Sequence, residues 1–234
     1  MSDPLEVAKE GDTMTRFLRQ HAARIVIGAV LAAAGYGVLI FWVPYQREQR
    51  IARTINTLGG RVGVEYRGPT WIPRYVQATV PFAGRIESVL IHGCSVPVTL
   101  TSEFRMLTHL KSLDLSWTKS TDAGMEHVGA LTHLEMLALK RSEVTDSGLL
   151  HLKDLTKLEW LILTDTRVTD SGLEHFKHLT SLEVLDLEGT QISDSGMKQL
   201  SHSSRLRRLF LTNSAVTDLG LKHLLSDSVE VEAR

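Results

Sequence analysis

Residues 158–179 read LEWLILTDTRVTDSGLEHFKHL, and the pattern of this stretch decides how the chain folds. Its opening frame, L-x-x-L-x-L-x-x-T, recurs every 24 residues with a small residue in the last place. The six copies begin at Ile86, Leu110, Leu134, Leu158, Leu182 and Leu206. A fixed period of this length is typical of solenoids, in which each repeat buries its apolar face against its neighbours. The sequence therefore predicts a stacked array over residues 86–225.

Each copy contains one strand pattern and one short helix pattern. Leu161 and Leu163 alternate with Trp160 and Ile162, as in a strand that buries one face. Further along, Leu173 and Phe176 have the i, i+3 spacing of a short helix that faces the core. Strand and helix in every unit predict an α/β solenoid, a horseshoe with a parallel concave sheet and short convex helices.

Two further columns of residues recur at the 24-residue period. The first holds small polar side chains, which we expect to satisfy backbone groups inside the turn that follows the strand. Its members are Cys94, Thr118, Ser142, Thr166, Thr190 and Ser214. The second holds aspartates that precede the helices, and we interpret them as helix N-caps. Its members are Asp122, Asp146, Asp170, Asp194 and Asp218. Calcium binding is the weaker alternative, because one carboxylate per layer supplies few of the six to eight oxygens.

The extended frame L-x-x-L-x-L-x-x-T-x-V-T-D-x-G-L resembles the leucine-rich repeat family, over residues 86–225. Together with the apolar segment, TLGG and RGPTWIP that precede the repeats, the chain resembles the single-span leucine-rich-repeat proteins of planctomycete bacteria. That resemblance implies an architecture more than an activity. T-D-x-G-L is also similar to F-box leucine-rich-repeat proteins, which select substrates for ubiquitination. No F-box-like pattern precedes the repeats here, so that role is a remote alternative.

A run of 19 uncharged residues, IVIGAVLAAAGYGVLIFWV, occupies positions 25–43. As a helix it would be about 28 Å long, close to the thickness of a bilayer core. We expect a single membrane span at 25–43 after an N-terminal tail at 1–24, with a cleavable signal peptide as the rival interpretation. Arginines flank both ends, so orientation is nearly balanced, and we favour repeats outside the cytoplasm. Residues 44–85 are predicted to form a linker helix and N-terminal cap, and residues 226–234 a C-terminal strand or tail.

Function is sought on the concave face, where the strand residues that avoid the core are exposed. Met136, Trp160, Ile162 and Val184 should form an apolar patch there, with Phe210 beyond it. Its predicted charged rim is Lys140, Asp186, Glu188 and Arg208. An apolar centre with a charged rim is typical of protein-binding surfaces, so a protein or peptide is the expected partner. The alternative is that these side chains are strand formers that bind nothing.

Other classes of function find little support in the composition or the motifs. The net charge of the chain is −1, which gives no reason to expect nucleic-acid binding. His127, His151, His175 and His223 recur with the repeat but have no companion ligands, so we predict no metal site and no cofactor. G-x-S-x-G and phosphate-binding glycine motifs are absent from the sequence, and an enzyme is not expected. Ser203 replaces a repeat leucine near the C-terminal end, which leaves self-association open. The alternative function is a structural or self-associating cell-envelope repeat protein without a specific ligand.

Overall fold

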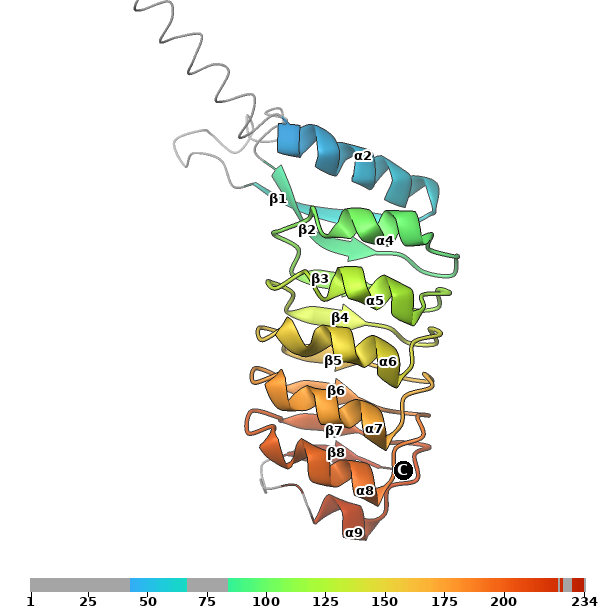
Figure 1. The fold of residues 1–234 in the computed structure, drawn as a ribbon, viewed down its shortest axis with the longest axis vertical. Helices are drawn as coiled ribbons and strands as arrows, with labels where there is room; N and C mark the ends of the chain where they lie inside the picture. The colour runs from blue at the N-terminus through green and yellow to red at the C-terminus, as the bar shows by residue number, and fades with distance from the viewer. Residues whose placement is uncertain (1–42, 67–83, 223, 225–228, 234) are drawn as a thin grey trace, which may run out of the picture. The chain divides into compact units, whose positions relative to one another are not determined.

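The computed structural model describes residues 43–66, 84–222, 224 and 229–233. The tail at 1–24 and nearly all of the predicted span at 25–43 lie outside this part of the chain. Within it, no helix combines the length and apolar character needed to cross a bilayer. Residues 47–234 form one compact unit, which Figure 1 shows as a succession of layers.

From β2 onward, strands and helices alternate along this unit. The strands are β1 (Arg61–Tyr66), β2 (Gly84–Leu90), β3 (Ser112–Asp114), β4 (Met136–Ala138), β5 (Trp160–Ile162), β6 (Val184–Asp186), β7 (Arg208–Phe210) and β8 (Glu230–Glu232). The helices are α2 (Val43–Thr57), α4 (Val98–Phe104), α5 (Asp122–Val128), α6 (Asp146–Leu149), α7 (Asp170–Leu173), α8 (Asp194–Met197) and α9 (Asp218–Leu221). Three 3₁₀ helices follow α6, α7 and α8 directly, at Leu150–Asp154, Glu174–His178 and Lys198–His202.

The described strands form one sheet in the order of the sequence, β1 to β8. β1 is antiparallel to β2, and every later pair is parallel. The register from β2 to β7 advances by 24 residues a strand, so that Met136 pairs with Trp160 and Trp160 with Val184. The helices lie on one face of this sheet (Figure 1). The α/β solenoid with a parallel sheet and short helices is the architecture that the period predicts.

The core lies between the sheet and the helices and is built mainly from the repeated leucines. Leu137, Leu161, Leu185 and Leu209 are wholly buried at the central position of successive strands. Phe176 and Met197 are buried against them from the helix layer. Each repeat therefore contributes apolar area mainly to the interfaces with the next layer on either side.

Helix α2 covers the first layer of the sheet. Ile51 and Ile55, which the sequence places on its apolar face, are buried, and Gly59 ends the helix with a φ of +78°. The carboxylate of Glu48 is also buried. It accepts hydrogen bonds from the Arg85 guanidinium at 2.9 Å and from the Ile86 backbone N–H at 3.0 Å. This ion pair ties the helix to β2, the first strand of the parallel array.

The aspartate column does not cap its own helices, so the N-cap prediction is wrong. The N-cap residue is the preceding threonine or serine, for example Thr145 before α6 and Thr169 before α7. Asp146 instead reaches the next repeat, where its carboxylate accepts from the Thr169 backbone N–H at 2.8 Å and from the Thr169 hydroxyl at 2.6 Å. Local capping rules miss this role because the two residues are 23 positions apart.

The same contact recurs between four pairs of layers and forms what we call the aspartate ladder. It joins Asp122 to Thr145, Asp146 to Thr169, Asp170 to Ser193 and Asp194 to Thr217. The ladder also explains the glycine of T-D-x-G-L. A Cβ at Gly172 would lie 2.5 Å from Oδ1 of Asp146, too close for a real contact. The threonine or serine, the aspartate and the glycine of the motif therefore serve the joint between layers.

The small polar column behaves as predicted at three of its positions. The hydroxyls of Thr118, Thr166 and Thr190 each donate to the backbone carbonyl three residues earlier, at 2.5 to 2.7 Å. Ser142 differs, because its buried hydroxyl has no hydrogen-bond partner in the described structure. The turn of this layer therefore contains a buried hydroxyl group whose hydrogen-bonding capacity is not used.

Candidate functional site

The face of the sheet opposite the helices, which the sequence predicts to be concave and which we call the concave face, presents the strand side chains that avoid the core. The strand register aligns them in columns, with Met136, Trp160 and Val184 in one. In the next column, Ala138 lies in the layer of Met136 and Ile162 lies in the layer of Trp160. Since paired strands lie about 4.8 Å apart, these side chains are direct neighbours across the middle layers.

The apolar side chains predicted for the site differ in how much of each is available to a partner. Trp160 is 42% exposed and is the most prominent of them. Met136 and Ile162 are half-buried, whereas Val184 is only 7% exposed. We call Met136, Trp160, Ile162 and Val184 the concave patch, in which Val184 supports the surface more than it contributes area to it.

Phe210 is half-buried and lies outside this patch. Its register partner on β6 is Asp186, which in turn pairs with Ile162 on β5. A carboxylate therefore separates the phenyl ring from the apolar side chains of the middle layers. Phe210 forms a second, smaller apolar position towards the end of the sheet.

The four charged residues predicted as a rim have different environments. Asp186 is already engaged, since its carboxylate accepts from the Thr164 hydroxyl at 2.8 Å and from the Glu188 backbone N–H at 3.0 Å. Arg208 lies 3.8 Å from Glu230 on β8, at the long limit of an ion pair. Lys140 and Glu188 make no ion pair with any described residue. The charges of Lys140 and Glu188 are therefore more available to a partner than those of Asp186 and Arg208.

A column of strained residues at the end of the strands was not predicted from the sequence. Trp117, Arg141 and Asp165 occupy successive layers with φ of +61°, +53° and +54°, in the left-handed region that side chains other than glycine and asparagine rarely adopt. The Arg141 guanidinium lies 4.2 Å from the centre of the Trp117 ring, and its Nε lies 2.8 Å from the Asp165 carboxylate.

We call these three residues the left-handed ridge. Trp117 is 49% exposed on it, more than Trp160. Gly93, Gly189 and Asn213 occupy the same repeat position with positive φ, and their residue types were the signal that could have identified this column. Positive φ at this position in every layer shows that the turn after each strand requires it, whichever residue occupies the position.

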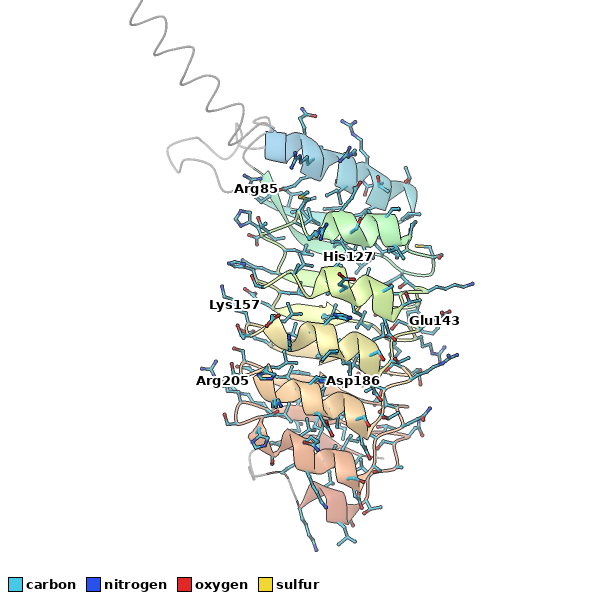
Figure 2. All side chains as sticks on the ribbon, viewed as in Figure 1. Arg85, His127, Glu143, Lys157, Asp186 and Arg205 are labelled. Carbon is cyan, nitrogen blue, oxygen red and sulfur yellow. The ribbon has the colours of Figure 1, made fainter. Side chains whose placement is uncertain are left out.

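The aspartate and histidine columns do not assemble into a metal centre among the described residues, where no group of three or more metal-binding side chains lies together. The ladder aspartates are spread one to a layer and use both carboxylate oxygens on the next repeat. His127 lies on α5 in the helix layer (Figure 2), away from the concave face.

Two segments of the chain match models of the leucine-rich repeat, described as "Leucine rich repeat" at residues 156–216 and "Leucine Rich repeat" at residues 107–128. Both matches fall within the array, and the first contains Trp160, Ile162 and Val184. No curated protein matches the sequence significantly.

Several solved structures are similar in shape at low sequence identity. Internalin C2 of Listeria monocytogenes is 19% identical, with a TM-score of 0.47 over 64% of this chain and 81% of that one. Internalin inlF of the same organism is 20% identical, with a TM-score of 0.45 over 62% of this chain and 46% of that one, so this chain spans less than half of its length. A pollen receptor kinase 3 is 15% identical, with a TM-score of 0.42 and coverage of 64% and 73%.

Proposed function

We propose that this chain is a protein-interaction module whose leucine-rich repeats bind a protein or peptide on the concave face. Leucine-rich-repeat domains generally mediate protein–protein interaction, and none of the columns forms a set of residues suited to catalysis. The observation that carries the proposal is Trp160, which is half-exposed among the apolar side chains of Met136 and Ile162. Tryptophan in such a setting is the residue type most enriched where binding energy concentrates.

The test compares proteins that co-purify with the full chain from native membranes and with two variants. Trp160→Ala should lose the partner, since it removes the largest exposed apolar side chain of the patch. Leu150→Ala is the matched control, because Leu150 is also an exposed apolar side chain but lies in the helix layer. Retention of every partner by Trp160→Ala would show that the patch does not bind.

The proposal includes a membrane anchor at residues 25–43, with the repeats outside the cytoplasm. Its support is the run of 19 uncharged residues, long enough to span a bilayer. Protease added to intact spheroplasts should digest the repeats. Digestion only after lysis would reverse the orientation, and release of the chain by alkaline carbonate would exclude an integral anchor.

Self-association is a second candidate, favoured by one observation at the C-terminal end. Ser203 stands where Leu155 and Leu179 are buried in earlier repeats, and a pocket opens beside it. Its apolar lining comes from Leu200, Leu206, Leu224 and Val229. Sedimentation of the full chain in detergent tests this role: a mass that doubles with concentration, and does not double for Ser203→Leu, would support it.

A further inference from the structure

We propose that the segment bound by the concave patch is basic, with lysine or arginine next to the apolar side chain that covers Trp160. This inference rests on the proposed function and specifies the chemistry of its partner. It is carried by Glu135, Glu159 and Glu183, which we call the acidic strip. Each immediately precedes a member of the first concave column, namely Met136, Trp160 and Val184.

The acidic strip is a continuous feature of the start of the strands. The backbone N–H groups of Glu159 and Trp160 both donate to the Glu135 carbonyl, at 2.8 and 3.0 Å. Those of Glu183 and Val184 donate in the same way to the Glu159 carbonyl, at 2.8 and 2.9 Å. The three glutamates therefore lie on consecutive layers, about 4.8 Å apart, along one border of the patch.

Two of the three carboxylates of this strip are not ion-paired within the described part of the chain. Glu135 and Glu159 form no ion pair with any described residue, and Glu183 lies 3.8 Å from Arg207. The column also contains Glu87 and Lys111 in the two layers before Glu135, and these two pair with each other at 3.0 Å. Lys157 and Arg205 lie at the same edge of the solenoid (Figure 2), but neither forms an ion pair with a described residue.

The other border of the patch supplies no excess of positive charge. On the left-handed ridge the charges of Arg141 and Asp165 offset each other in their ion pair. Nearer the patch, the two positive charges of the rim, on Lys140 and Arg208, are matched by the two negative charges of Asp186 and Glu188. The ridge and the rim therefore do not offset Glu135 and Glu159, the two unpaired carboxylates next to Met136 and Trp160 in the sequence.

Unpaired charge around an apolar centre affects which partners bind, according to the sign of their charge, more than it raises the affinity of binding. A basic segment gains from both parts of the surface, whereas an acidic or phosphorylated segment meets repulsion beside the ring. Each exposed ion pair contributes up to about fivefold in affinity, and added salt weakens that contribution.

The experiment uses a library of random dodecapeptides displayed on phage, selected on the immobilised full chain in detergent. Peptides that the wild-type chain enriches, and Trp160→Ala does not, should carry a large excess of lysine and arginine over aspartate and glutamate. The variant Glu135→Lys/Glu159→Lys/Glu183→Lys should invert this preference. The neutral variant Glu135→Gln/Glu159→Gln/Glu183→Gln should abolish the preference for basic peptides. This variant tests the inference if the lysine variant fails to fold.

The matched control is Glu126→Lys/Glu143→Lys/Glu174→Lys, which changes net charge equally at exposed positions away from the strip. Glu143 marks the opposite edge of the solenoid in Figure 2. This control should select the same basic peptides as the wild type. The inference would be overturned if the Trp160-dependent peptides showed no excess of basic residues. It would also be overturned if the Glu→Lys strip variant selected the same basic peptides as the wild type. Either result would leave the proposed function standing. If the selection yields no peptide whose binding depends on Trp160, the proposed function itself is contradicted.

Discussion

Leu161 and Trp160 are neighbours on β5, yet they belong to regions of the molecule under opposite constraints. Leu161 is wholly buried, and a leucine occupies its position in each neighbouring repeat. Trp160 faces the concave side, where its register partners are Met136 and Val184. The core face is copied because every layer must fit the next, whereas the concave face varies because nothing within the solenoid covers it. Stability should therefore depend on the copied positions and binding on the varied ones.

The largest effect should come from Leu161→Ala. Removing a fully buried leucine from between two layers should cost about 3 kcal/mol of unfolding free energy, as the loss of burial and the remaining cavity add together. Chemical denaturation of the full chain in detergent, followed by circular dichroism, measures the change. A loss below about 1 kcal/mol would mean that the layers rearrange to fill the space.

Gly172→Ala should be the next largest, at about 2 kcal/mol, because the added Cβ collides with Oδ1 of Asp146. Asp146→Ala should cost a similar amount, since it removes both acceptors of Thr169. The double variant tests the ladder directly. It should be less destabilised than the sum of the two by about 1 kcal/mol, because the collision with Oδ1 disappears with the carboxylate, while the approach to Cδ1 of Leu149 at 2.9 Å remains. Strict additivity would refute the contact between these layers.

The sequence predicted the strands and the buried leucines because period and alternation report directly on packing between identical layers. It did not predict the true role of Asp146, because an aspartate before a helix satisfies the local rule for an N-cap while its actual partner, Thr169, lies in the next repeat. The motif T-D-x-G-L thus describes a joint between layers that is visible only when two repeats are stacked.

The candidate site was predictable in position and less so in exposure. The 24-residue period places Met136 beside Trp160 in the observed register. The burial of Val184 depends on the bulk of its neighbours, which a period does not encode. The ridge was missed for another reason: tryptophan and arginine have no preference for positive φ, so Trp117 and Arg141 carry no local signal of their conformation.

Trp160→Ala should have a small effect on stability despite the size of the side chain, about 1 kcal/mol or less, because much of the ring is already in contact with water. Measured by the same denaturation as Leu161→Ala, the two neighbours should differ by severalfold. A similar loss for both would mean that Trp160 holds the strands together and that its exposure is no guide to binding.

The smallest effect should come from the small polar column in the turns, where the hydrogen bond of the hydroxyl group is not made in every repeat. The buried hydroxyl of Ser142 has no partner in the described structure, so Ser142→Ala should be neutral or stabilising by about 0.5 kcal/mol. Thr166→Val is the matched comparison, because it removes a hydroxyl that donates to the Leu163 carbonyl and should cost about 1 kcal/mol. Opposite signs in the two denaturation midpoints would show that the column stabilises each layer only where its hydrogen bond is made. If Ser142→Ala proved as costly as Thr166→Val, the Ser142 hydroxyl would have to be bonded in solution, and the turn would be uniform through all the layers.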